Sequence, residues 1–206
     1  MWRGERIIGP QAIFALPEII EYHGILRAKE LREYGIAHPW LSRLVQSRCI
    51  ARVSRGLYAL PHDQPSLLAM VAKRVNLGVV CLRSALEFHG LEPDEASQLW
   101  IAIGPKSRRP RLDFRGVQIV HFSGLSLTEG IHTHLLPEKI PVCVYGVAKT
   151  VVDCFKFRRK VGLELAVRAL RWALDRRLCS VDEVRRFAVI CRVSTIVERY
   201  LEPSRL

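Results

Sequence analysis

The sequence predicts an α+β protein, with an N-terminal winged helix-turn-helix followed by a mixed α+β C-terminal domain that ends in a helical segment. Three observations predict this fold class. Short helical patterns separated by glycines occupy residues 11–47, and a hairpin pattern follows at residues 50–60. Strand-like runs then alternate with short helices until Ala148, where the pattern becomes helical up to residue 201.

The N-terminal part is interpreted as three helices and a hairpin. Pro17 lies inside the first helical pattern, so the regular part of that helix is expected to begin just before it. Pro39 is favoured at a first helical position, and Leu41, Leu44 and Val45 have the spacing of a buried stripe. The expected elements are helices at residues 11–22, 27–34 and 39–47 and strands at 50–53 and 57–60.

A proline-flanked segment marks the expected domain boundary. Residues 61–66 read PHDQPS, and two prolines this close together disfavour both helix and strand. We therefore expect a winged-helix domain over residues 1–62 and an α+β C-terminal domain over residues 63–206.

The C-terminal part mixes strands and helices, with the strands first and the helices last. This order indicates an α+β domain whose helices are segregated from the sheet. The expected strands are at residues 78–82, 99–103, 117–122, 130–134 and 142–145, and the expected helices at 66–75, 84–89, 148–159, 163–177, 181–190 and 193–201.

The charge of the chain favours an anionic partner. Its 206 residues include 32 Lys and Arg against 20 Asp and Glu, a formal net charge of +12, and residues 1–62 carry +4 of it. Nucleic acid or a membrane surface fits such a surplus, although charge that serves only solubility fits it as well. No run reaches the roughly 18–20 apolar residues of a membrane span, and the N-terminus makes a poor signal peptide. We therefore expect a cytoplasmic protein with no membrane partner.

The six cysteines form no C-x-x-C pattern, so neither a zinc ribbon nor a thioredoxin-like motif is predicted. A chain of this length builds its core without disulfides, and buried free thiols are expected. The cysteines are Cys49, Cys81, Cys143, Cys154, Cys179 and Cys191.

The helix expected at residues 39–47 is the candidate DNA-reading element. A major groove about 12 Å wide accepts one helix, whose outward N-terminal positions reach base edges. The hairpin turn that follows offers cations for the adjacent backbone or minor groove. The candidate DNA-binding residues are His38, Trp40, Ser42, Arg43, Arg52, Ser54 and Arg55.

Particular chemistry is expected of two of these side chains. Arg43 suits a bidentate contact with a guanine, and Ser42 suits a phosphate or a base edge. Two other interpretations stay open. A unit of this kind also serves as a protein–protein module, and Trp40 is a core residue if the helix is rotated from this assignment.

Two clusters of cations stand out in the C-terminal part. They are candidates for a nucleic-acid-binding or antitoxin surface, or for solvated faces, and the second also complements a helix dipole. The first cluster is Lys106, Arg108, Arg109, Arg111 and Arg115, and the second is Lys156, Arg158, Arg159 and Lys160.

No pattern of catalytic residues is found. The sequence has no Walker loop, no G-x-S-x-G, and no Gly-Ser followed by the paired Asp of nucleotidyltransferases. His132 and His134 face one way on an expected strand, but no Cys or carboxylate lies at a recognisable metal-ligand spacing from them. We expect no enzyme activity, no catalytic residue, no metal site and no cofactor.

Four stretches of the sequence resemble the AbiEi family, the antitoxins of AbiE-type toxin–antitoxin systems. They cover most of residues 26–201 in the order found in the family, and they read LREYGIAHPWLSRLVQSRCIARVSRGLYALP, VVCLRSALEFHGL, LWIAIGPKSRRPRL and VYGVAKTVVDCFKFRRKVGLELAVRALRWAL. Two positions depart from the family pattern. Val147 stands where Pro is common, and Arg48-Cys49 replaces the usual glycine after the reading helix.

The resemblance implies a bacterial transcriptional autorepressor that binds double-stranded DNA at repeats in its own promoter. It also implies a role in phage defence, in which the C-terminal antitoxin domain opposes a nucleotidyltransferase-like toxin. Such systems are described as type IV, because toxin and antitoxin form no stable complex. Lys149, Thr150 and Asp153 of the fourth stretch are interpreted as structural residues first and as an antitoxin surface second.

Overall fold

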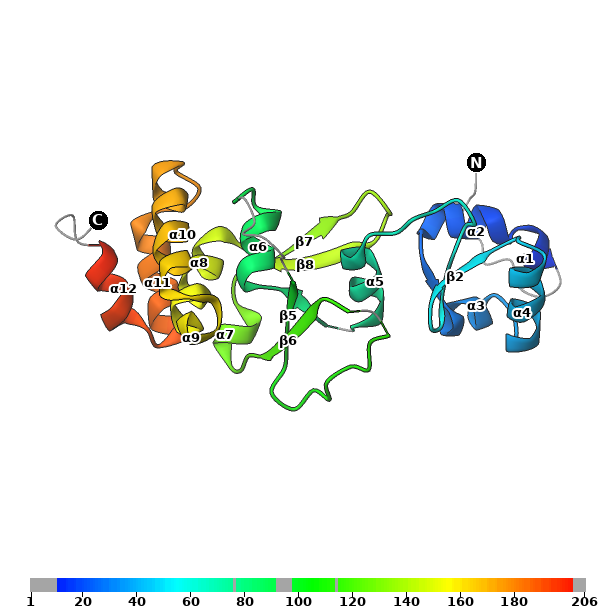
Figure 1. The fold of residues 1–206 in the computed structure, drawn as a ribbon, viewed down its shortest axis with the longest axis horizontal. Coiled ribbons are helices and arrows are strands. Elements are labelled where there is room, and N and C mark those ends of the chain that lie inside the picture. The colour runs from blue at the N-terminus through cyan, green and yellow to red at the C-terminus, as the bar shows by residue number, and fades with distance from the viewer. Residues whose placement is uncertain (1–10, 76, 92–97, 114, 202–206) are drawn as a thin grey trace. The chain divides into compact units, whose positions relative to one another are not determined.

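The computed structural model describes residues 11–75, 77–91, 98–113 and 115–201 (Figure 1). It has the mixed α+β composition that the sequence predicts, with two separate sheets. The chain forms two compact units. The N-terminal unit is Met1–Asn76 with Pro110–Phe114 and Leu135–Val142, and the C-terminal unit is Leu77–Arg109, Arg115–His134 and Cys143–Leu206.

The N-terminal unit is a set of short helices beside a three-stranded sheet. The strands pair antiparallel in the order β1-β3-β2, with Tyr58 of the central strand opposite Leu26 on one side and Arg52 on the other. Its elements are α1 (Gln11–Phe14), α2 (Leu16–His23), β1 (Leu26–Arg27), α3 (Ala28–Glu33), α4 (His38–Gln46), β2 (Ala51–Ser54), β3 (Leu57–Ala59) and α5 (Leu67–Arg74).

Local sequence explains where these helices begin and end. Pro17 and Pro39 each lie in a first turn, where the missing amide hydrogen costs nothing. Gly24 follows α2 at φ +69°, and a Cβ there would lie only 2.0 Å from the carbonyl oxygen of Glu138, so a glycine is required. After α4 the left-handed turn is made by Arg48 at φ +58°, so the helix ends there without a glycine.

Two apolar clusters hold the N-terminal unit together. The larger one joins α2, α3, α4 and the sheet. The smaller one buries Ile25 and Leu57 against Ala69 of α5 and Ile140 of the 135–142 segment. Residues far apart in the sequence therefore complete the core of this unit.

The C-terminal unit contains a five-stranded sheet and a group of helices. The strand order is β6-β5-β4-β8-β7, in which β4 pairs antiparallel with β5 and parallel with β8, and β5 pairs parallel with β6. Its elements are β4 (Val79–Val80), α6 (Leu82–Phe88), β5 (Leu99–Ile103), β6 (Val117–His121), α7 (Leu125–Thr128), β7 (Ile131–Leu135), β8 (Pro141–Tyr145), α8 (Val147–Lys156), α9 (Arg158–Val161), α10 (Leu163–Asp175), α11 (Val181–Cys191) and α12 (Ser194–Leu201).

Helix α8 is the centre of the C-terminal unit. It contacts α6, α10 and α11, and residues 148–155 are all buried. Lys149 and Asp153, one helical turn apart, form an ion pair in which both side chains are fully buried. The Lys149 ammonium also lies 4.1 Å from the ring centroid of Tyr145 and 5.0 Å from that of Phe122.

The elements differ from the predictions in a few places. Leu26, expected beside the second helix, belongs to strand β1, which pairs with a strand more than thirty residues later. Leu82, expected at a strand end, begins α6. The helix expected at 148–159 is two helices, and the short helix α7 was not predicted. All six cysteines are free, but only three of them are buried: Cys49 is exposed, and Cys143 and Cys179 are half-buried.

Candidate nucleic-acid interface

Helix α4 has one buried and one open side. Leu41 and Leu44 are buried against the N-terminal unit, so the helix is fixed in its rotation. The residues between them point outward, and every predicted reading residue of this helix is exposed. These residues are His38, Trp40, Ser42 and Arg43.

Trp40 and Arg43 form a stacked pair on this open side. The guanidinium carbon of Arg43 lies 5.1 Å from the Trp40 ring centroid, a distance typical of a cation–π contact. Trp40 keeps 44% of its surface exposed, so it is not a core residue. The stack holds Arg43 in place without burying its hydrogen-bond donors.

The β2–β3 hairpin stands beside α4. Gly56 makes its turn at φ +72°, and Arg52 and Arg55 are exposed, whereas Ser54 is half-buried. A groove of about 410 Å³ lies between helix and hairpin. Its lining includes four of the predicted residues, His38, Ser42, Arg52 and Arg55, together with Gln46.

The hairpin tip is held by two contacts that the sequence did not reveal. The Arg74 guanidinium of α5 donates a hydrogen bond to the carbonyl of Arg55. On the other side, Asp113 accepts hydrogen bonds from Ser54 Oγ and from the Arg55 amide, both at 2.7 Å. These two bonds lower the pKa of the Asp113 carboxyl. In the sequence, the only feature that could have indicated these contacts is that Asp113 is a single acidic residue inside a run of cations.

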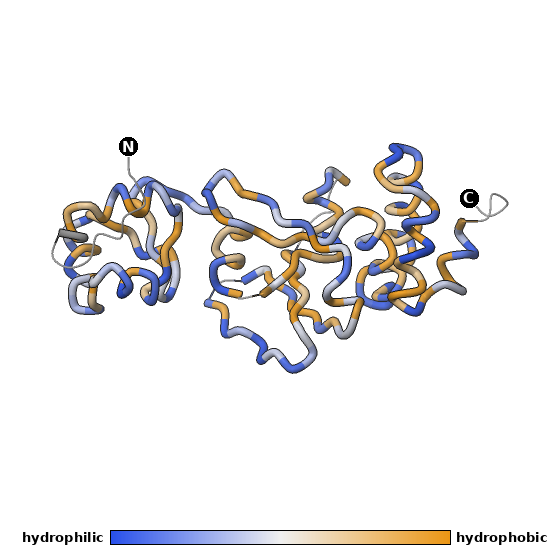
Figure 2. Tube along the Cα trace, turned by 180° about the vertical axis from the view of Figure 1, so that it is seen from behind, coloured by the Kyte–Doolittle hydropathy of each residue, from blue (hydrophilic) through white to orange (hydrophobic). Residues whose placement is uncertain are grey.

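The first cationic cluster of the C-terminal part lies on the connection between β5 and β6. Figure 2 shows this connection as a largely hydrophilic stretch. All its predicted cations are exposed, namely Lys106, Arg108, Arg109, Arg111 and Arg115.

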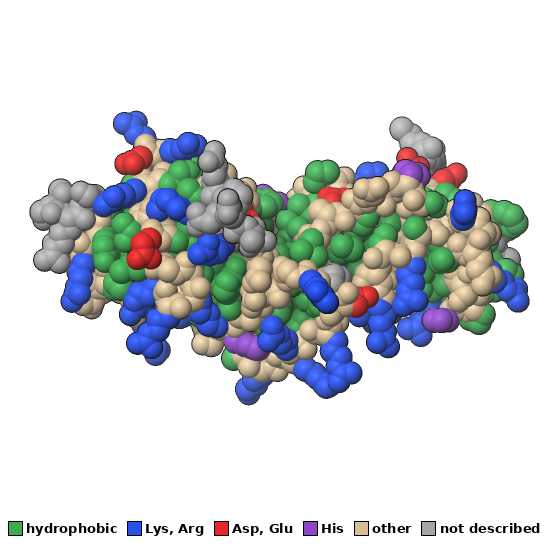
Figure 3. All heavy atoms as spheres, in the orientation of Figure 1, with side chains coloured by type: hydrophobic (Ala, Val, Ile, Leu, Met, Phe, Trp, Pro, Cys, Tyr) green, Lys and Arg blue, Asp and Glu red, His purple; other side chains and the backbone are tan. Residues whose placement is uncertain are grey.

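The second cluster follows α8, and part of it serves the fold. The Lys156 ammonium donates to Ser126 Oγ at 3.0 Å and lies over the Phe122 and Phe157 rings. Arg158 donates to the Phe155 carbonyl at 3.1 Å. Arg159 and Lys160 are exposed. In the view of Figure 3, Lys and Arg side chains are more frequent at the surface than Asp and Glu side chains.

The buried polar residues of α8 belong to the core. Lys149, Thr150 and Asp153 have no exposed surface, which excludes the interpretation of these three side chains as an antitoxin surface. Burial raises the pKa of Asp153 to about 6, against the opposing effect of Lys149. Cys191 Sγ donates to the second carboxylate oxygen of Asp153 at 3.4 Å.

Two of the histidines contact groups of the C-terminal unit. Burial lowers the pKa of His89, whose ring bonds the Tyr145 carbonyl at 2.7 Å, and His134 packs against Phe88. Across residues 11–75, 77–91, 98–113 and 115–201, no three His, Cys, Asp or Glu side chains gather in a way that could hold a metal ion.

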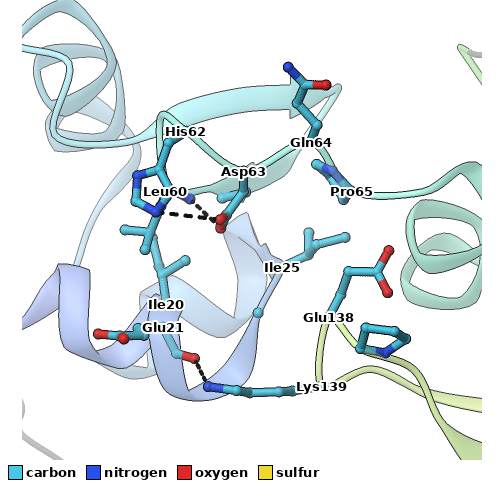
Figure 4. A pocket seen from close by; sticks show the side chains of 13 residues that line it. Ile20, Glu21, Ile25, Leu60, His62, Asp63, Gln64, Pro65, Glu138 and Lys139 are labelled. Carbon is cyan, nitrogen blue, oxygen red and sulfur yellow. Dashed lines mark hydrogen bonds and ion pairs between the residues drawn. The ribbon is translucent and has the colours of Figure 1, made fainter.

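A pocket of about 470 Å³ lies within the N-terminal unit, between α2, the 60–65 segment and the 137–139 turn (Figure 4). Its polar groups bond to the protein itself. Lys139 Nζ donates to the Glu21 carbonyl at 2.6 Å, Asp63 accepts from the Leu60 amide, and Glu138 accepts from the amide of Ser66. These bonds fasten the 135–142 segment to the unit, so we interpret the pocket as structural.

The helices were also considered as membrane spans. Within the part of the chain that the structure describes, no helix combines the length and the apolar character needed to cross a bilayer.

Comparisons with known proteins agree with this geometry. A search of the curated proteins found no match. Among solved structures, the chain is similar to the crystal structure of the RV2827C protein from Mycobacterium tuberculosis, with a TM-score of 0.58 and 16% sequence identity over 98% of this chain and 80% of that chain. At this identity the likeness is one of fold.

The N-terminal segment that carries α4 and the hairpin also matches a family by sequence. Residues 15–61 fit the family described as "Transcriptional regulator, AbiEi antitoxin". This segment spans α2 to β3 and contains all seven predicted DNA-binding residues. The resemblance that the sequence indicated is therefore confirmed over residues 15–61, which match the AbiEi antitoxin family of transcriptional regulators.

Proposed function

We propose that this protein is a DNA-binding antitoxin that represses its own toxin–antitoxin operon. The observation that carries the proposal is the open side of α4, where His38, Ser42 and Arg43 are exposed beside the cationic hairpin. The regulator family matched by this segment supports a role in transcription.

The proposed complex follows the winged helix-turn-helix pattern. Helix α4 enters the major groove, and Arg43, steadied by Trp40, donates two hydrogen bonds to the edge of a guanine. Ser42 reaches a base edge or a phosphate. The hairpin acts as the wing, and Arg52 and Arg55 neutralise phosphates of the adjacent backbone.

A single domain of this size reads a short site, so two copies on adjacent promoter repeats raise the affinity to a useful level. The deciding experiment is a fluorescence-anisotropy titration with the upstream region of the gene and with random duplex, across a salt series. Selective binding to the upstream region supports the proposal. Equal affinity for both duplexes contradicts operator recognition and favours an RNA-binding or nonspecific basic module, and absence of binding favours a protein-interaction module.

In the second half of the proposal, the C-terminal domain opposes the toxin. The toxin is nucleotidyltransferase-like, and the two proteins act in the cytoplasm, in a type IV phage-defence system, without a stable complex. The exposed cations of the two C-terminal clusters are the proposed antitoxin surface, which meets either RNA that the toxin modifies or an acidic patch of the toxin. No catalysis, metal or cofactor is assigned to the antitoxin itself.

A growth-rescue assay tests this half. Full-length protein with Glu at Arg108, Arg109 and Arg159 is expected to lose protection against the induced toxin, since all three side chains are exposed. The matched control reverses three exposed cations outside the clusters: Arg171, Arg176 and Arg199. Full protection by a stably folded cluster variant would contradict the basic-surface mechanism.

We also propose that the chain divides functionally at residues 62–66. Limited proteolysis is expected to cut this segment, where Pro61, His62 and Gln64 are exposed. Cleavage only at the termini would contradict separable domains.

A further inference from the structure

The wing tip presents two hydrogen-bond donors to a single anion. Ser54 Oγ and the Arg55 amide lie next to each other in the chain, and each donates to a different oxygen of the Asp113 carboxylate at 2.7 Å. A phosphodiester offers the same arrangement, two charged oxygens on one central atom. Hydroxyl and backbone amide groups are common donors to DNA phosphates.

The tip keeps its shape by other means than Asp113. Gly56 makes the turn, β2 and β3 pair up to Ser54 and Leu57, and the Arg74 guanidinium holds the Arg55 carbonyl. The donors would therefore stay in place if the carboxylate left. Asp113 itself is exposed and is held through its carboxylate, so it can be exchanged for another anion.

The sequence around Asp113 makes a carboxylate unusual there. Residues 104–116 read GPKSRRPRLDFRG, in which Asp113 is the only acid among five cations. Negative charge beside a DNA backbone lowers affinity. Here the Asp113 carboxylate occupies two hydrogen-bond donors, Ser54 Oγ and the Arg55 amide, on the surface that we propose contacts that backbone. The wing itself contributes two exposed cations, Arg52 and Arg55, to attract a phosphate to this point.

We propose that the wing tip is a binding site for a backbone phosphate of DNA, and that Asp113 occupies this site in the free protein as a built-in competitor. DNA binding exchanges the carboxylate for a phosphate on Ser54 Oγ and the Arg55 amide. The inference rests on the proposed DNA-binding function and adds that Asp113 lowers the affinity for DNA.

The factor by which Asp113 weakens DNA binding follows from the fraction of molecules in which its carboxylate occupies the site. When only the open fraction of molecules binds, the apparent Kd equals the intrinsic Kd divided by that fraction. A site closed in about nine molecules of ten therefore weakens binding about tenfold. Because a phosphate contact carries no base information, operator and random duplex are restrained alike.

The first test compares the Kd of the wild-type protein with that of Asp113→Asn. Asparagine keeps the size of the side chain and removes its charge. We expect Asp113→Asn to bind operator and random duplex about five- to tenfold more tightly. The matched control is Asp182→Asn, which removes the same charge from a side chain that is 95% exposed in the C-terminal unit, and we expect less than about a twofold change. Unchanged or weaker binding by Asp113→Asn would overturn the inference and would show that Asp113 stabilises the hairpin tip instead.

A double-mutant cycle identifies the shared donor. Ser54→Ala removes one donor from both the carboxylate and the phosphate, so the two losses partly cancel in the wild-type background. In the Asp113→Asn background only the phosphate contact is lost. We therefore expect Ser54→Ala to weaken DNA binding more in Asp113→Asn than in the wild type, and equal losses would contradict competition for that donor.

The amide resonance of Arg55 reports on the site without DNA. In NMR spectra of the full chain it is expected to move in Asp113→Asn and to stay in place in Asp182→Asn, with the remaining dispersion showing that both are folded. If neither wild type nor Asp113→Asn binds any duplex, the proposed function and this inference fail together. If the wild type binds and Asp113→Asn gains nothing, the inference alone fails.

Discussion

The two units each hold an aspartate that accepts two hydrogen bonds, with opposite consequences. Asp113 is exposed at the wing tip, and its hydrogen bonds lower its pKa. Asp153 is fully buried in the C-terminal core, and loss of water raises its pKa to about 6 despite the neighbouring Lys149. The two residues are of the same type and accept the same number of hydrogen bonds. The difference in their pKa shifts therefore comes from solvent access, which is open at Asp113 and closed at Asp153.

The largest expected effect is on the buried pair. Asp153→Ala leaves the Lys149 ammonium uncompensated inside the C-terminal core. Removal of one partner of a buried ion pair costs about 3–5 kcal/mol of unfolding free energy. Asp113→Ala, at an exposed position, is expected to cost less than about 1 kcal/mol. Urea unfolding followed by near-UV circular dichroism measures both, and similar losses in the two variants would remove the contrast.

The stability of the protein is expected to fall as the pH rises from about 4 to about 6 through the contribution of Asp153. The folded state keeps the Asp153 proton up to about pH 6, whereas the unfolded chain releases it near pH 4. Protonation therefore favours the folded state, and this contribution to stability is lost on deprotonation.

Urea unfolding at several pH values tests this dependence. Asp153→Asn is expected to flatten the fall between pH 4 and pH 6, because its side chain does not titrate. Asp113→Asn serves as the control with the opposite sign: its lowered pKa adds stability that is present above about pH 4 and lost on acidification. An equally steep fall in Asp153→Asn would assign the pH dependence to other groups.

In the N-terminal unit, Arg43→Ala is expected to weaken operator binding by about 1–3 kcal/mol and to relax preference at one base position. The structure adds that Trp40 loses its stacking partner, so tryptophan fluorescence should change with the same substitution. Titration of single-base operator variants measures the preference. An unchanged preference profile in a folded protein would show that α4 is not the reading helix.

The smallest effect is expected at the wing. Arg55→Ala should weaken binding to all sequences about equally and reduce the slope of log K against log salt by about one. The backbone amide of residue 55 is retained in this variant, so the phosphate site on Ser54 Oγ and that amide remains. A loss confined to the operator would instead assign base reading to the wing.

Local signals account for what the sequence predicted. The start of α4 follows from Pro39, its buried side from Leu41 and Leu44, and the hairpin from Gly56. These features depend on neighbours within a few residues, so a single sequence reveals them. The seven DNA-binding candidates were found in this way, although their roles stay predictions.

Contacts over long sequence distances account for what was missed. Strand β1 has only two residues and exists because it pairs with β3. Asp113 meets Ser54 across 59 positions, and no local pattern indicates that a loop returns to the wing. Lys149 and Asp153 were interpreted as structural residues first and as an antitoxin surface second. Their complete burial depends on the packing of α6, α10 and α11 around α8, which the sequence alone did not predict.

The apolar cluster that buries Ile25 and Leu57 also contains Ile140, so it can be completed only late in translation. Ile25 and Leu57 leave the ribosome early, whereas the residue that completes their cluster is made more than eighty positions after Leu57. At about 5–20 residues per second, this interval lasts roughly 4–16 seconds. During that time Ile25 and Leu57 lack the residue that completes their apolar cluster, so the nascent chain exposes apolar surface to which chaperones bind. We therefore expect the proposed repression to begin only after residue 140 has been synthesised.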